Sequence, residues 1–175
     1  MSLFGSNKKK VSTPRAKILW HKFDKSATIP TKRKSDAGYD VYTIEDNIGI
    51  MPHETKLLRT GLGVVTPEGY WFLCKDRGST GSIGMHLHCG VVDAGYRGEL
   101  FISLCNTTDK ILYISSDVDK VEVTQNTIRY PKSKALMQMI LVKLPDVSSA
   151  EIDDKEWEKY TNTERGMGKL GSSKK

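Results

Sequence analysis

The stretch "GVVDAGYRGELFISLCN", residues 90–106, joins two segments rich in β-branched and aromatic side chains through a turn that contains Gly95 and Gly98. Valine, isoleucine and phenylalanine favour strands, whereas glycine favours turns. Segments of the same kind recur along the chain, at residues 17–23, 39–44, 53–66, 69–76, 87–92, 98–106 and 135–144. Short strands at this spacing predict an all-β protein, built as a barrel or a sandwich.

The composition indicates one soluble globular domain. The chain has 175 residues, 38% of them hydrophobic, and no apolar run approaches the length of about 20 residues that a membrane helix needs. The formal net charge is +6, with basic clusters at residues 8–10, 32–34 and 174–175. Clusters at chain ends are typical of solvated tails, so we expect no specific nucleic-acid binding. Local positive potential would also suit a polyphosphate ligand.

The cysteines and histidines do not form a recognisable metal motif. Cys74, Cys89 and Cys105 lie in apolar runs without paired spacing, which predicts reduced, buried thiols in a cytoplasmic protein. In "GMHLHCG", strand alternation would put His86 and His88 on one face, an arrangement compatible with metal ligation. No third ligand is evident in the sequence, so the simpler interpretation, two structural histidines, is preferred.

The two ends of the chain differ from the middle. Residues 1–16 form a basic segment that we expect to be flexible, ahead of a domain at residues 17–160. A helix is predicted over residues 148–160, capped by Ser149. Residues 161–175 are polar and Gly-rich, and we expect them to be mobile when nothing is bound. This tail is either a disordered end or a lid that closes over a ligand.

Asp93 stands between an apolar triplet and a Gly-Tyr-Arg-Gly turn. Taken alone, an aspartate between two strands is most simply a turn residue. Gly90 and the following turn glycines would let the backbone approach a ligand closely, and Tyr96 would supply a flat face for a base or sugar. In that setting the Asp93 carboxylate could accept a proton from water.

Two further segments suit a polyphosphate. "DRGSTGSIG", residues 76–84, follows a strand and places Arg77 beside small residues whose hydroxyl and N–H groups can surround phosphate oxygens. The tail carries Arg165 among glycines, with serines behind it. Such a tail could close over a triphosphate and exclude water.

Together and in this order, these segments resemble the five motifs of the trimeric dUTP pyrophosphatase (dUTPase) family. The matching segments are "AGYDV" (37–41), "DRGSTG" (76–81), "GVVDAGYRGEL" (90–100), "ALMQMI" (135–140) and "RGMGKLGSS" (165–173). The third match is the most specific. The resemblance implies a jelly-roll-like β-barrel with a flexible C-terminal arm, assembled as a homotrimer whose active sites are shared between subunits.

The resemblance also implies an activity and a set of site residues. Family members hydrolyse dUTP to dUMP and pyrophosphate with Mg²⁺, which limits uracil incorporation into DNA and supplies dUMP. By matching position, Asp93 would be the general base, and Asp40 would hold a water of the metal shell. The other catalytic residues implied are Arg77, Ser79 and Arg165. The substrate-binding residues implied are Gly78, Gly90, Val91, Val92, Tyr96, Gln138, Leu170, Gly171 and Ser172.

This chain departs from the family pattern at several places. Gly78 stands where the family has a serine that touches the phosphates, and Leu170 stands where it has a phenylalanine that stacks on uracil. Residues 111–134 form a longer interval than usual, and the alternation of "KVEVTQNTIRY" (120–130) within it predicts an extra hairpin arm. Some phage members carry an insert there, so we expect a phage or prophage source. The arm is either a plain surface hairpin or a site for a protein partner.

Two rival functions follow from these features. The related dCTP deaminases share the fold, but they carry a catalytic glutamate where this chain has Ser103, which argues against deamination. The second rival is a regulatory interaction protein that keeps the fold and uses residues 111–134 to bind a partner.

Overall fold

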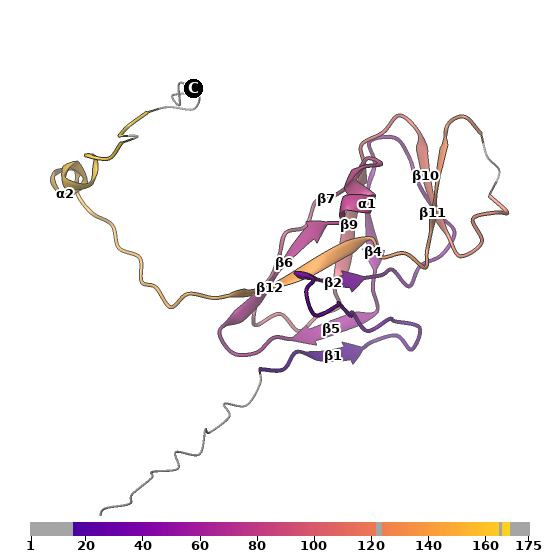
Figure 1. The fold of residues 1–175 in the computed structure, drawn as a ribbon, viewed down its shortest axis with the longest axis horizontal. Coiled ribbons are helices and arrows are strands. Elements are labelled where there is room, and N and C mark those ends of the chain that lie inside the picture. The colour runs from indigo at the N-terminus through magenta and orange to yellow at the C-terminus, as the bar shows by residue number, and fades with distance from the viewer. Residues whose placement is uncertain (1–15, 122–123, 165, 169–175) are drawn as a thin grey trace, which may run out of the picture. The chain divides into compact units, whose positions relative to one another are not determined.

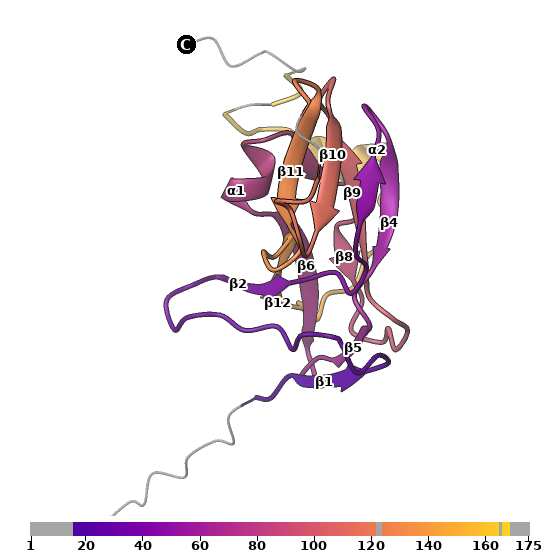
Figure 2. The ribbon, with the colours of Figure 1, turned by 90° about the vertical axis from the view of Figure 1, so that its right-hand side faces the viewer.

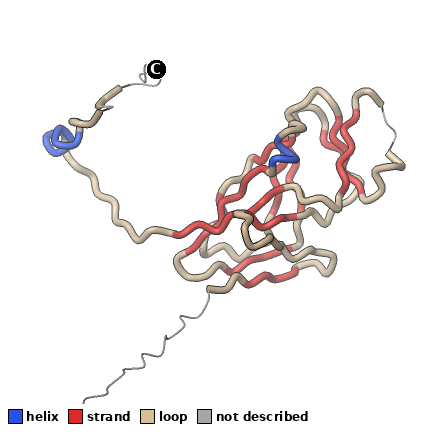
Figure 3. Tube along the Cα trace, in the orientation of Figure 1, coloured by secondary structure: helices blue, strands red, loops and turns tan. Residues whose placement is uncertain are grey.

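Strands account for most of the regular structure, and the fold is all-β as predicted (Figures 1 and 3). The computed structural model describes residues 16–121, 124–164 and 166–168. The chain divides into two units, one ending at Leu144 and the other beginning at Pro145. None of the helices in the described ranges is long and apolar enough to cross a membrane.

The first unit holds the strands and one short helix. Its strands are β1 (Leu19–Lys22), β2 (Gly38–Val41), β3 (Ile48–Ile50), β4 (Thr55–Arg59), β5 (Leu62–Val65), β6 (Tyr70–Asp76), β7 (Met85–Leu87), β8 (Val91–Val92), β9 (Phe101–Asn106), β10 (Ile111–Ser115), β11 (Thr127–Pro131) and β12 (Met137–Lys143). Helix α1 (Gly78–Gly81) is a single turn between β6 and β7.

The sheets share one core, which makes the unit a jelly-roll-like barrel. Their strand orders are β1-β5, β11-β10-β3, β2-β12-β6-β8 and β4-β9-β7. Each sheet contributes fully buried side chains to the same cluster, among them Leu62, Leu112, Phe72 and Ile102. Burial of this apolar surface is the main force that holds the sheets together.

Strand alternation determines which side chains face away from this core. On β12, Met137 and Met139 are buried, so Gln138 between them points outward. Gln138 lies opposite Asp40 in the antiparallel pairing of β12 with β2. The register of two strands that are distant in sequence therefore brings an amide and a carboxylate together on the outer face.

The prediction of a hairpin arm at residues 120–130 is wrong for the residues that the structure describes there. β10 and β11 pair in parallel, with Ile111 opposite Thr127 and Ser115 opposite Pro131 (Figure 2). Parallel strands cannot be joined by a tight turn, so the chain crosses back between Ser115 and Thr127 before β11 begins. β10 also pairs with β3, which ties this interval into the barrel.

Several predicted boundaries shift in the structure. The strand predicted at residues 53–66 is two strands, β4 and β5, separated by Gly61 at φ +67°. The strand predicted at residues 87–92 is likewise β7 and β8. Sequence patterns locate apolar runs, but the turns inside a run depend on which strands pair.

The second unit contains a much shorter helix than predicted. Helix α2 spans Asp154–Trp157 and continues as one 3₁₀ turn, Glu158–Tyr160. Its N-cap is Asp153, whose carboxylate accepts the Glu156 N–H at 2.8 Å, in place of the predicted Ser149. The tail residues Arg165, Leu170, Gly171 and Ser172 lie outside the described residues, so the lid remains a prediction.

Candidate active site

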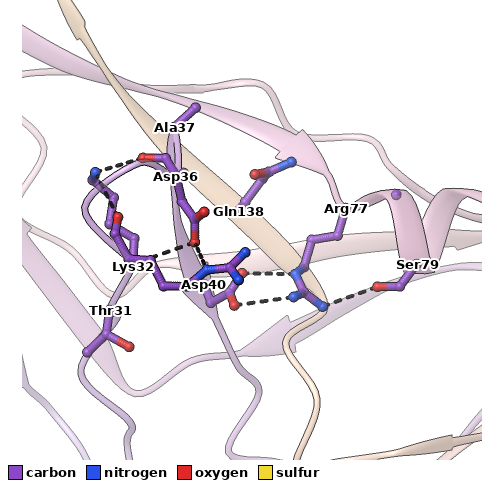
Figure 4. A pocket seen from close by; sticks show the side chains of 11 residues that line it. Thr31, Lys32, Asp36, Ala37, Asp40, Arg77, Ser79 and Gln138 are labelled. Atoms are coloured by element: carbon purple, nitrogen blue, oxygen red, sulfur yellow. Dashed lines mark hydrogen bonds and ion pairs between the residues drawn. The ribbon is translucent and has the colours of Figure 1, made fainter.

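Asp40 and Arg77 form a two-pronged ion pair at the centre of the candidate site (Figure 4). Arg77 Nε donates to Asp40 Oδ1 at 2.9 Å, and Nη2 donates to Oδ2 at 3.2 Å. β2 presents the carboxylate, while the guanidinium follows directly after β6. This geometry is the strong, planar form of arginine–carboxylate contact, and it holds the guanidinium in one orientation.

The remaining contacts of Arg77 connect it to α1 and to the start of β12. Its Nη1 donates to Ser79 Oγ and to the Ala135 carbonyl, both at 3.2 Å. The hydroxyl of Tyr130 donates to the same carbonyl at 2.9 Å, and burial raises the pKa of Tyr130. Arg77 therefore uses four of its five N–H donors on protein acceptors, in a position set by three separate segments.

The short helix α1 brings Ser79 back toward Arg77. The Arg77 N–H donates to the Thr80 hydroxyl at 3.1 Å, and Thr80 is buried. Arg77 is the N-cap of α1, and this contact joins its N–H to the side chain at the third position of the turn. An added Cβ at Gly78 would meet nothing within 4 Å, so Gly78 is not required by packing.

Gln138 is held by contacts on both sides. Its Nε2 donates to the Asp76 carbonyl at 2.8 Å. On the other side its side chain lies across Gly38, where a Cβ would come within 2.5 Å of Gln138 Oε1. Position 38 thus requires glycine for close approach, which the sequence pattern alone does not reveal.

These side chains line one open pocket of about 820 Å³, here called the arginine pocket (Figure 4). Its described lining residues are Thr31, Lys32, Arg33, Asp36, Ala37, Gly38, Asp40, Arg77, Gly78, Ser79 and Gln138. Five predicted site residues therefore come together: Asp40, Arg77, Gly78, Ser79 and Gln138. Lys32, Arg33 and Asp36 were not predicted, although the basic run at residues 32–34 directly precedes the first motif.

Asp93 lies elsewhere, on the turn after β8. β8 pairs with β6, and the Cys74 N–H donates to the Gly90 carbonyl at 2.8 Å. The turn closes with a hydrogen bond from the Tyr96 N–H to the Asp93 carbonyl at 3.0 Å. The Asp93 side chain is exposed to solvent.

A second, smaller pocket of about 180 Å³ lies against this turn and is called here the hairpin pocket. Its described lining residues are Cys74, Cys89, Val91, Val92, Asp93, Tyr96, Glu99, Leu100, Phe101 and Met137. The Tyr96 hydroxyl donates to the Glu99 carbonyl at 2.7 Å, and its ring covers Gly98, where a Cβ would come within 2.5 Å of that hydroxyl. Tyr96 therefore presents a fixed aromatic surface.

Two cysteines of the hairpin pocket interact. A hydrogen bond with Cys74 lowers the pKa of Cys89 to about 6, and the same interaction raises the pKa of Cys74. The spacing of the cysteines gave no signal for this contact, because it depends on the pairing of β6 with β8.

The two histidines considered as metal ligands have separate partners. His86 Nδ1 lies 3.3 Å from Asp76 Oδ2, and His88 Nδ1 lies 3.2 Å from the Thr55 hydroxyl. Over the described part of the chain, no group of three or more His, Cys, Asp or Glu side chains could hold a metal ion. The interpretation of both as structural residues remains a prediction.

The fold is an all-β barrel that carries an arginine–carboxylate pocket and a glycine-rich turn with an aspartate. Such a combination is typical of proteins that bind phosphorylated ligands. A family model described as dUTPase matches residues 24–120. Deoxyuridine 5'-triphosphate nucleotidohydrolase of Clostridioides difficile is 30% identical over 156 residues, covering 87% of this chain and 94% of the relative. The protein of the same name from Mycobacterium bovis is 31% identical over 157 residues, covering 87% and 91%. The chain belongs to the dUTPase family, which confirms the resemblance found in the sequence.

Solved structures show the same fold. A Staphylococcus bacteriophage 80alpha dUTPase with dUpNHpp matches with a TM-score of 0.69 at 24% identity, covering 91% of this chain and 99% of that one. A mutant of the dUTPase from phage phi11 of S. aureus, described with a structural Mg(II) ion, matches with a TM-score of 0.65 at 21% identity, covering 80% and 99%. These likenesses confirm the predicted fold class.

Proposed function

We propose that this enzyme hydrolyses dUTP to dUMP and pyrophosphate. The observation that carries the proposal is the arginine pocket, where Asp40, Arg77, Ser79 and Gln138 converge from distant parts of a chain of the dUTPase family. The dUTP hydrolases among its relatives support the same substrate. The reaction would limit uracil incorporation into DNA and supply dUMP.

Asp93 is the proposed general base. Its exposed carboxylate takes a proton from water, whose oxygen then forms a bond to the α-phosphorus. The bond between that phosphorus and the bridging oxygen breaks, and pyrophosphate leaves. General-base assistance of this kind contributes about 10²- to 10⁴-fold to the rate.

Arg77 and Ser79 are the proposed groups that stabilise the charge developing on the phosphates. Arg77 is already oriented by Asp40, so little reorganisation is needed when the phosphate arrives. Gln138, held in its position over Gly38, would donate a hydrogen bond to the phosphates or accept one from a neighbouring group. Gly78 adds only backbone to this set.

The hairpin pocket is the proposed nucleoside site. Backbone groups of Gly90, Val91 and Val92 would read the uracil edge, and the ring of Tyr96 would pack against deoxyribose. A ribose hydroxyl at C2′ would collide with that ring, which would exclude UTP.

A homotrimer with shared sites is the proposed assembly. Within one chain, Asp93 lines the hairpin pocket, whereas Arg77 lines the arginine pocket. A neighbouring subunit would supply Asp93 to each arginine pocket. The third subunit would supply the tail, with Arg165 on the phosphates and Leu170, Gly171 and Ser172 over the nucleotide.

Mg²⁺ is the proposed cofactor, held mainly by the substrate. Asp36 and Asp40 line the arginine pocket, but each already accepts a hydrogen bond from an arginine. This donor set fits Mg²⁺, which keeps several waters and binds through phosphates with one or two carboxylates. Asp40 would hold one of those waters. When bound, the ion would neutralise part of the triphosphate charge.

The cytoplasm is the proposed compartment. Cys74, Cys89 and Cys105 are all free thiols, as expected where thiols stay reduced. A partner at residues 111–134 remains a prediction.

Pyrophosphate release from dUTP, dCTP, dTTP and UTP in parallel tests the proposed function. We expect hydrolysis of dUTP alone, with Asp93→Asn slower by about 10²- to 10⁴-fold. Comparable rates on UTP or dTTP would reject the substrate assignment, and a fully active Asp93→Asn variant would reject the base.

Mixing subunits tests the shared site. Arg77→Ala and Asp93→Asn chains, unfolded and refolded together in equal amounts, should regain activity in about one site in four, since one site needs both wild-type residues from neighbouring chains. Mixtures no more active than either variant alone would exclude sites shared in this way.

A further inference from the structure

The segment "TKRKSD", residues 31–36, here called the basic loop, forms one wall of the arginine pocket. Lys32, Arg33 and Asp36 from this loop line the pocket together with Asp40 and Arg77. Figure 4 shows Lys32 and Asp36 beside the Asp40–Arg77 pair. From the sequence, the basic cluster at residues 32–34 indicates only a local positive potential that would suit a polyphosphate, and none of the five motifs includes Lys32, Arg33 or Asp36.

The loop decides the charge of the described pocket. Arg77 and Asp40 neutralise each other, and the other lining residues outside the loop are uncharged. Lys32 and Arg33 add two positive charges against the single negative charge of Asp36, which leaves the pocket with a net charge of +1. A triphosphate carries several negative charges, so binding favours a site with positive charge in excess.

The loop is held in a defined shape. Its start is fixed by the Asp40 N–H, which donates to the Thr31 carbonyl at 3.0 Å. Lys32 Nζ donates to the Asp36 carbonyl at 2.7 Å and lies 5.5 Å from the centre of the Tyr39 ring. Lys32 Nζ also donates to the Arg33 carbonyl at 3.5 Å. An ammonium has three N–H donors, so Lys32 retains one donor for a ligand while its position is held.

Arg33 can exchange its present carboxylate partner for a phosphate. Its Nε donates to Asp36 Oδ2 at 2.9 Å, but the Arg33 side chain is 87% exposed. The hydrogen bond from Arg33 lowers the pKa of Asp36, so the pair is ionised at neutral pH. Exposed pairs of this kind contribute little stability, and a phosphate can replace the carboxylate as the partner of the guanidinium.

We propose that Lys32 and Arg33 form a phosphate subsite that binds the pyrophosphate portion of the nucleotide. The proposal rests on the proposed function, because it assigns two further ligands to the same pocket. Lys34 is the matched control, since it is exposed and cationic but does not line the pocket.

The experiment compares Lys32→Ala, Arg33→Ala and Lys34→Ala by two measurements. Calorimetric titration gives the Kd of inorganic pyrophosphate, and steady-state kinetics give KM and kcat for dUTP. Loss of one charge-assisted contact should raise both Kd and KM about tenfold in the first two variants, with kcat within about twofold of wild type. Lys34→Ala should change neither quantity, and Lys32→Arg should retain most of the pyrophosphate affinity.

The outcomes separate this proposal from the proposed function. If wild type hydrolyses dUTP while Lys32→Ala and Arg33→Ala behave like Lys34→Ala, the subsite is rejected and the function stands. If wild type does not hydrolyse dUTP but pyrophosphate binding still weakens only in Lys32→Ala and Arg33→Ala, the subsite stands and the function is rejected. Equal weakening in all three variants would indicate general attraction by the loop and would also reject the subsite.

Discussion

Replacing Gly38 with alanine tests how the arginine pocket is built. Gly38 opens β2, and the side chain of Gln138 lies directly across it. A Cβ at this position would lie 2.5 Å from Gln138 Oε1 and 2.9 Å from Gln138 Cβ. Cβ atoms in folded proteins essentially never lie within 3.0 Å of another non-bonded heavy atom, and both separations are shorter than this. The Gln138 side chain or the two strands must therefore move.

The cost follows from these contacts. Forcing an extra methyl group into a packed site costs about 1–3 kcal/mol. Displacing Gln138 also breaks its 2.8 Å hydrogen bond to the Asp76 carbonyl, worth about 1 kcal/mol. The sum of roughly 2–4 kcal/mol should lower Tm by about 5–15 °C for a chain of this size. Because a 1 Å misplacement in a site can reduce activity by about 10²-fold, we expect kcat/KM for dUTP to fall by ten- to a hundredfold.

Thermal unfolding at fixed protein concentration and steady-state kinetics provide the assay. Gly49→Ala is the control, because that glycine also lies in a strand but its added Cβ would meet only the Tyr113 ring at 3.8 Å. The control should match wild type in Tm and activity. A Gly38→Ala protein with the Tm and kcat/KM of wild type would show that Gln138 does not lie over Gly38, and Gln138 would then not be fixed in the arginine pocket by this contact.

Three further predictions concern the two pockets. Gly78→Ser should fold normally, because nothing lies within 4 Å of the new Cβ, and its hydroxyl beside Arg77 should raise kcat for dUTP up to about tenfold; an unchanged kcat would mean that the glycine costs no turnover. The rate of iodoacetamide labelling of Cys89, followed by mass spectrometry, should rise as the pH passes through about 6. The reason is that the hydrogen bond with Cys74 lowers the pKa of Cys89 to about 6 and the thiolate is the reactive form. A labelling rate that rises only above about pH 8 would contradict this pKa. Tyr96→Ala should raise the ratio of kcat/KM for UTP to that for dUTP about tenfold or more, because the ring that would exclude the C2′ hydroxyl is removed; an unchanged ratio would assign sugar selection to another residue.

Local sequence patterns determine much of this protein. Runs of β-branched and aromatic residues predict an all-β fold, since strand preference and turn preference depend on neighbours in sequence. The glycine-rich turn around Asp93 is equally local, and the five ordered motifs identify the family. The same patterns do not locate the break between β4 and β5 at Gly61 or the start of α2 at Asp154, because these depend on contacts made in the folded chain.

Only the tertiary structure decides which of these segments meet. Asp40 and Arg77 are distant in sequence, and their ion pair exists because β2 and β6 both flank β12. The parallel pairing of β10 with β11 and the wall formed by Lys32 and Arg33 depend in the same way on long-range register. Alternation along a strand assigns each side chain to one face of the sheet. Which side chains of other strands lie next to it depends on how the strands pair by hydrogen bonding, and this pairing is set by the whole fold.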